Sequence, residues 1–181
     1  AKKLKNIHLW NFYTMINKNF RSFICGIKGY KLLNNEKKFL KKYKPWGIIL
    51  FSRNFKNIKQ TQQLINKIKN LFNDKNYPIL VDEEGGRVSR LKKFIENSTF
   101  TAEYFGKLYK LNKNKFFLYF EVYVKQISNI LNTLGININT VPVLDLRRYK
   151  SNAIIGNRSY SRNKFIVSDL GNICISLFQK N

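Results

Sequence analysis

The residues best suited to chemistry form one short run, Asp82–Arg90, in which three consecutive carboxylates precede two glycines and two arginines. Carboxylates accept hydrogen bonds from vicinal hydroxyls, and arginine donates a rigid fork of N–H groups to hydroxyl, ring or acyl oxygens. Glycine lets the backbone approach a ligand or bend sharply. The run therefore suits a polyhydroxylated ligand, although the same residues could form an ion-paired loop that only ends the preceding strand.

Two later segments could bring further polar side chains to the same place. Val141–Leu146 carries Asp145, which could line the site or bind backbone amides of the next loop. Ile154–Tyr160 places Arg158 after a Gly-Asn turn, from which it could reach the same site. The only histidine is His8, near the N-terminus, so neither a Ser-His-Asp arrangement nor a His-based metal site is expected.

Short apolar runs alternate with amphipathic helical patterns along the chain. Four near-continuous apolar runs predict buried parallel strands: Ser22–Cys25, Gly47–Phe51, Pro78–Val81 and part of Ile136–Leu144. Apolar residues at three-to-four spacing predict four helices: Asn35–Tyr43, Ile58–Phe72, Lys115–Leu134 and Asn163–Lys180. Gly135 is a suitable C-terminal cap for the third of these helices. The alternation predicts four βα units and an α/β fold.

Four βα units fit either an open doubly wound sheet or half of an eight-unit barrel. A dinucleotide-binding sheet requires Gly-x-Gly-x-x-Gly directly after a strand, and Gly26 and Gly29 do not supply it. The three carboxylates of Asp82–Glu84 would also repel a pyrophosphate. We therefore favour a TIM-type (β/α)8 barrel, of which this chain carries about the first four units. Active sites of such barrels lie at the carboxyl ends of the strands, which is where Asp82 stands.

Composition limits the other classes of function. The 181 residues are 44% hydrophobic and 15% aromatic, enough for one globular core. The net charge of +24 suggests nucleic-acid binding, but the lysines are spread along the whole chain without a zinc-finger spacing or RNP-type motif, so no specific nucleic acid is expected as a partner. No apolar run reaches the roughly 18 residues of a membrane helix, and no secretory signal is evident, so we expect a cytoplasmic protein without a membrane partner.

The run Asp82–Leu91, DEEGGRVSRL, resembles the Asp-Gln-Glu-Gly-Gly-Arg-Val-x-Arg signature of bacterial β-N-acetylhexosaminidases of glycoside hydrolase family 3. Three further blocks agree with the family in order and spacing: FICGIKG, PWGIILFSRN, and VPVLDL followed by IIGNRSYS. The resemblance covers about Phe20 to the end. We therefore expect residues 1–19 to be an N-terminal extension and residues 20–181 to be the N-terminal half of the barrel.

The resemblance implies an enzyme that removes terminal N-acetylglucosamine with retention, through a covalent glycosyl-enzyme. It implies a role in peptidoglycan recycling, a GlcNAc-containing cell-wall fragment as the carbohydrate substrate, and no metal or other cofactor. By motif position, Asp82 would bind sugar hydroxyls, and Arg90 and Arg158 would contact the substrate.

Departures from the family concern the catalytic groups. The family's proton-transfer histidine follows the fifth strand and its nucleophilic aspartate follows the seventh, so both are expected beyond Asn181, with no catalytic residue within the chain. We therefore expect residues 1–181 alone to be inactive. Asn157 stands where the family usually has Asp, removing a possible charge partner of Arg158, and Glu83 replaces the usual Gln. The alternatives are a family-3 β-glucosidase, whose arginine loop differs, and a basic nucleic-acid-binding module.

Overall fold

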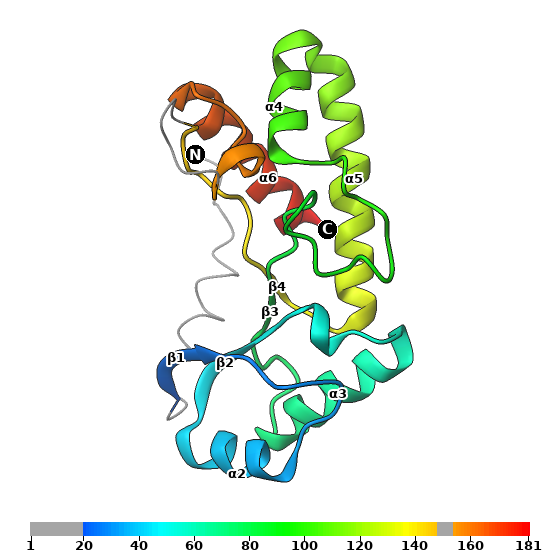
Figure 1. The fold of residues 1–181 in the computed structure, drawn as a ribbon, viewed down its shortest axis with the longest axis vertical. Coiled ribbons are helices and arrows are strands. Elements are labelled where there is room, and N and C mark those ends of the chain that lie inside the picture. Colours follow the sequence, from blue (N-terminus) through cyan, green and yellow to red (C-terminus); the bar gives the residue numbers. More distant parts are fainter. Residues whose placement is uncertain (1–19, 148–153) are drawn as a thin grey trace, which may run out of the picture.

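The computed structural model describes residues 20–147 and 154–181, so the expected extension 1–19 and His8 lie outside the described residues. One sheet of four parallel strands, in the order β1-β2-β3-β4, forms the centre of the fold (Figure 1). The strands are β1 (Arg21–Cys25), β2 (Pro45–Leu50), β3 (Ile79–Val81) and β4 (Ile138–Asn139). The parallel order confirms the predicted α/β fold.

Helices follow the strands in the predicted order, with one addition. They are α2 (Asn34–Tyr43), α3 (Ile58–Leu71), α4 (Ala102–Leu111), α5 (Lys113–Leu134) and α6 (Lys164–Lys180). Two 3-10 turns are η1 (Ser52–Asn54) and η2 (Gly156–Arg158). Gly135 caps α5 at φ 87°, as expected, and its N–H donates to Leu131 and Asn132. Helix α4 was not predicted; Asn112 alone separates it from α5.

The predicted fourth strand is much shorter than its apolar run. It pairs with β3 only at Ile138 and Asn139, and the amide of Thr140 still donates to Val81. Beyond that point the chain leaves the sheet. Leu144 reaches α6 instead, where a Cβ added to Gly171 would lie 2.6 Å from Leu144 Cδ2. The apolar character of VPVLDL therefore reflects contact with a helix rather than strand formation, because residues 141–146 belong to no strand.

The two faces of the sheet are covered differently. Fully buried side chains on one face belong to the main core and are Ile48, Leu50, Ile79 and Val81. The strand register places a second apolar row on the opposite face: Ile24, Ile49, Leu80 and Ile138. In this row Ile24 is 44% exposed. Because inward-facing side chains of the strands fill the interior of a (β/α)8 barrel, this row is part of the interior surface that four strands provide.

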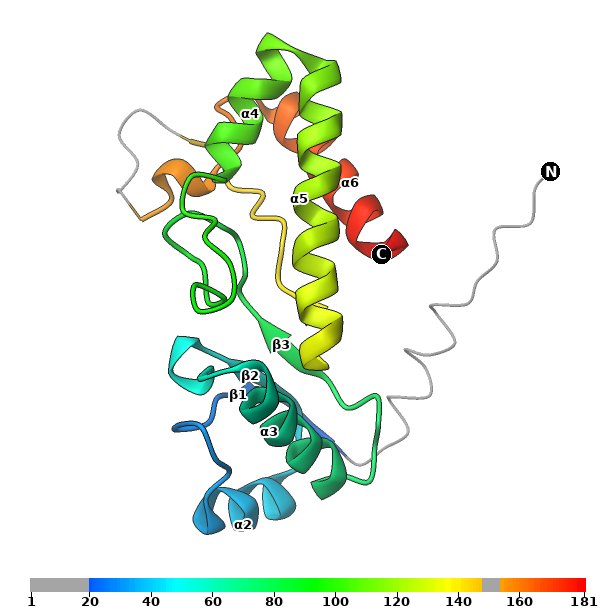
Figure 2. The ribbon, with the colours of Figure 1, turned by 90° about the vertical axis from the view of Figure 1, so that its right-hand side faces the viewer.

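Helix α5 runs through the upper part of the molecule in Figure 2, and α4 and α6 pack beside it. Between α4 and α5 lies an aromatic cluster formed by Phe105, Phe116, Phe120 and Tyr123. Helices α2 and α3 lie at the opposite end, beside β1 and β2. Within the described ranges, no helix combines the length and the hydropathy needed to cross a bilayer.

Candidate functional site

The side chains of the three acidic residues after β3 point alternately to the open space at the carboxyl end of the sheet and into the core. The side chains of Asp82 and Glu84 are 27% and 11% exposed, whereas Glu83 is only 1% exposed. Successive side chains of an extended segment point to opposite faces, and this segment continues β3. Asp82 and Glu84 are therefore available at the carboxyl end of the sheet, and Glu83 is not.

Asp82 is held by groups from two other segments. Its Oδ1 accepts a hydrogen bond of 2.6 Å from Thr140 Oγ1, just after β4, and its Oδ2 lies 3.6 Å from Arg90 Nη2. The Arg90 guanidinium in turn lies 5.5 Å from the ring centre of Phe51, which follows β2. The structure thus brings two predicted site residues together at the ends of three neighbouring strands. Arg90 Nε is buried and has no hydrogen-bond partner among the described residues.

Glu83 anchors the loop that carries the site. Its Oε2 accepts from the amides of Arg90 and Leu91 at 2.7 and 2.9 Å, and its Oε1 accepts from Asn97 Nδ2 at 2.7 Å. The side-chain amide of Asn139 binds the Glu83 backbone at both its N–H and its C=O, each at 3.0 Å. These five bonds fix the start of the loop and the position of Arg90.

The two glycines of the run serve the path of the loop. Gly85 and Gly86 have φ of 80° and 59°, which residues with a Cβ rarely adopt. A Cβ at Gly85 would lie 2.3 Å from the carbonyl oxygen of Phe100 and 2.6 Å from Tyr123 Oη. Burial, with a smaller contribution from Glu83, raises the pKa of Tyr123. Of the two roles considered for these glycines, sharp bending is the one that the structure shows.

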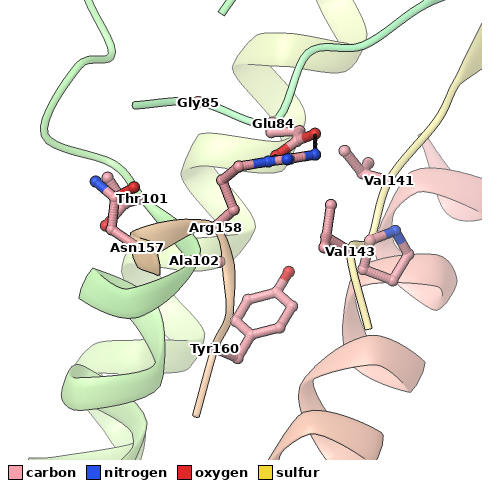
Figure 3. Close-up of a pocket in the computed structure, with 10 residues that line it drawn as sticks. Glu84, Gly85, Thr101, Ala102, Val141, Val143, Asn157, Arg158 and Tyr160 are labelled. Carbon is pink, nitrogen blue, oxygen red and sulfur yellow. Dashed lines mark hydrogen bonds and ion pairs between the residues drawn. The ribbon is translucent and has the colours of Figure 1, made fainter. Parts of the chain in front are cut away.

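Arg158 reaches the same loop through Glu84. Its Nε donates to Glu84 Oε2 and its Nη2 to Glu84 Oε1, both at 2.7 Å, in a two-pronged ion pair (Figure 3). These bonds to Glu84 raise the pKa of Arg158, with smaller contributions from Asp145 and Asp82. Asn157, where the family usually has Asp, gives Arg158 no charge partner, and the partner is instead Glu84, 74 residues away in sequence.

Further contacts hold the loop of η2 against the loop that follows β3. Arg87 donates to the carbonyls of Ile154 and Ile155. Asp145 is exposed, and its carbonyl accepts from Ser159 Oγ at 2.6 Å. Because Asp145 also raises the pKa of Arg158, its carboxylate belongs to the electrostatic surroundings of the site.

A small hollow lies beside the Glu84–Arg158 ion pair. Its lining includes Thr101, Val141, Asn157 and Tyr160 (Figure 3). Its volume of about 20 Å³ exceeds the roughly 10–15 Å³ that one water molecule needs. Ligand pockets usually have about 300 Å³ or more, so this hollow cannot itself hold a sugar ring. Within residues 20–147 and 154–181, no three His, Cys, Asp or Glu side chains are grouped to hold a metal ion.

The family model of the glycosyl hydrolase family 3 N-terminal domain matches residues 2–181. The chain belongs to this family. A β-hexosaminidase of Neisseria meningitidis is 37% identical over 153 residues, which are 81% of this chain and 40% of that protein. A β-hexosaminidase of Thioalkalivibrio sulfidiphilus is 30% identical over 156 residues, 86% of this chain and 44% of that protein. The family-3 chain therefore spans less than half the length of these relatives.

Solved structures of the family have the same fold over most of the chain. NagZ from Neisseria gonorrhoeae, in complex with N-trifluoroacetyl-D-glucosamine, has a TM-score of 0.75 and 31% identity, over 89% of this chain and 47% of that one. A family-3 β-N-acetylglucosaminidase from Paenibacillus has a TM-score of 0.69 and 26% identity, over 87% of this chain and 29% of that one. These matches confirm the predicted family and the predicted partial barrel.

Proposed function

We propose that this chain is the sugar-binding half of a retaining β-N-acetylhexosaminidase that removes terminal N-acetylglucosamine. The observation that carries the proposal is the placement of Asp82, Arg90 and the Glu84–Arg158 pair at the carboxyl ends of parallel strands, in a chain whose relatives are β-hexosaminidases. Residues 1–19 remain a proposed N-terminal extension, and residues 20–181 the proposed half barrel.

Each proposed binding residue supplies a different kind of contact. Asp82 has a partly exposed side chain whose carboxylate oxygens can accept from sugar hydroxyls, because its two present partners leave lone pairs free. Arg90 and Arg158 supply N–H donors for hydroxyl or acyl oxygens. Carboxylates and arginines around a ring of hydroxyls are suited to a terminal sugar. The names of the curated relatives favour a hexosaminidase over the alternative β-glucosidase.

We propose that the wider setting is cytoplasmic recycling of peptidoglycan, with a GlcNAc-containing cell-wall fragment as substrate and no nucleic-acid or membrane partner. Retaining hydrolysis requires a nucleophile on one face of the sugar and a proton donor at the leaving oxygen. The histidine and aspartate that the family resemblance implies for these roles are not among the residues placed at this site.

Residues 1–181 on their own are expected to bind N-acetylglucosamine without cleaving its glycosides. The physical reason is that retaining hydrolysis needs a nucleophile and a proton donor, and groups that bind substrate and transition state equally well do not accelerate the chemical step. A chromogenic N-acetylglucosaminide incubated with the purified chain measures this directly. Release of the chromophore above the rate of a no-protein blank would contradict the assignment of the catalytic groups.

Replacement of Asp82 tests the binding site. We expect Asp82→Ala to weaken N-acetylglucosamine binding by about tenfold to hundredfold, the usual effect of losing hydrogen bonds to a charged group. Titration of the chain with N-acetylglucosamine, followed by NMR chemical shifts, gives the dissociation constant. Asp169→Ala, a change of the same kind on the exposed face of α6, is the matched control. Equal binding by the wild type and Asp82→Ala would refute the proposed role of Asp82.

A further inference from the structure

Local charge at the mouth of the sheet differs from the charge of the whole chain. The chain carries a formal charge of +24, yet both arginines proposed to contact substrate already face a carboxylate. Arg90 lies 3.6 Å from Asp82, and Arg158 is bonded twice to Glu84. A ligand approaching these arginines therefore meets ion pairs rather than free cations.

The pairing with Glu84 also fixes the orientation of Arg158. Two parallel bonds of 2.7 Å use Nε and Nη2 and hold the guanidinium in one plane. The third nitrogen, Nη1, has only a long contact of 3.4 Å to the Ile154 carbonyl. Nη1 is therefore the nitrogen of Arg158 best able to donate to a ligand.

We infer that Glu84 is a positioning and specificity-determining residue, which orients Arg158 and cancels its charge so that the site selects uncharged sugars. The inference rests on the proposed function, because it requires that Arg158 contact the sugar. A neutral hydroxyl or acyl oxygen can accept from Nη1 at little electrostatic cost. A carboxylate at the same place would lie close to Glu84, whose oxygens are 2.7 Å from the guanidinium, and like charges at such short range repel.

Two variants separate the orienting effect of Glu84 from its charge. In Glu84→Gln the side chain keeps its shape but has one acceptor oxygen, so the two-pronged pair is lost and Arg158 keeps an uncancelled charge. We expect N-acetylglucosamine to bind about tenfold more weakly and glucuronic acid to bind several-fold more tightly. Arg158→Lys keeps the charge pair but lacks the two-pronged geometry of the guanidinium. The binding of N-acetylglucosamine should therefore weaken, with no gain in the binding of glucuronic acid.

NMR titrations of the 1–181 chain with each sugar give the required dissociation constants. Glu121→Gln removes the same charge from an exposed ion pair with Lys125 on α5, and it should change the affinity for neither sugar. The exchange of the Arg158 Nε proton with water, followed by its NMR signal, tests the orientation of the guanidinium without ligand. This proton should exchange slowly in the wild type and rapidly in Glu84→Gln. Far-UV circular dichroism establishes that each variant is folded.

The outcomes distinguish this inference from the proposed function. If wild-type binding depends on Asp82 but Glu84→Gln weakens both sugars alike, or changes neither, only the inference about Glu84 is wrong. If the wild type binds no N-acetylglucosamine, the proposed function fails, and the inference fails with it. An Arg158 Nε–H that exchanges rapidly in the wild type would overturn the orienting role on its own.

Discussion

Gly106→Ala is expected to destabilise the protein by about 3 kcal/mol, although alanine normally favours a helix by about 1 kcal/mol over glycine. Gly106 lies in the middle of α4, against the backbone of Tyr160. A Cβ there would lie 1.8 Å from the Tyr160 carbonyl oxygen and 2.7 Å from its carbonyl carbon. Backbone cannot move aside as a flexible side chain can, so either α4 or the segment after Arg158 must shift.

Urea unfolding followed by circular dichroism measures this effect as a change in the free energy of unfolding. Gly29→Ala is the matched control, because beyond Gly29 and its two chain neighbours no heavy atom lies within 4 Å of the added Cβ, and its effect should stay within about 0.5 kcal/mol. Stability equal to or above that of the wild type in Gly106→Ala would mean that α4 does not pack on Tyr160. The packing matters for the site, since Tyr160 follows Arg158 by two residues.

Glu83→Ala is expected to cost roughly 3–5 kcal/mol of stability, because it leaves several buried donors without an acceptor. The donors are the amides of Arg90 and Leu91 and the side-chain amide of Asn97. The loss of these hydrogen bonds should also free the loop that carries Asp82 and Arg90, so sugar binding should weaken together with stability. Urea unfolding and the N-acetylglucosamine titration measure the two effects in the same samples.

Glu83→Gln separates the hydrogen bonds of Glu83 from its charge. The Gln oxygen can still accept from the amides of Arg90 and Leu91. Its Nε2 can donate to Asn97 Oδ1, which is buried without a partner among the described residues, once the Asn97 amide turns over. We therefore expect a cost within about 1.5 kcal/mol. A loss as large as that of Glu83→Ala would show that the negative charge itself is required.

Much of the fold could be predicted because the sequence patterns that indicate its strands and helices are local. Each of the four apolar runs and four helical periodicities lies within one continuous stretch of at most 20 residues, and all correspond to observed elements. Helix α4 was missed although Thr101 caps its N-terminus, because Gly106 in its centre is a weak helix former whose place is explained only by its burial against Tyr160. The short β4 was overestimated because apolar residues that pack on α6 look the same in sequence as residues of a buried strand.

The candidate site also has features that could be predicted from the sequence and features that only the tertiary structure determines. Sequence alone placed three acids, two glycines and two arginines at the end of a strand, and the resemblance pointed to Asp82, Arg90 and Arg158. It could not separate the roles of the three acids, because alternation assigns faces only when the neighbouring strands and helices are known. Tertiary structure decided that Glu83 is buried as an anchor and that Glu84 holds Arg158. An ion pair between residues 74 positions apart forms only when the barrel brings two loops together, and no local pattern encodes that distance.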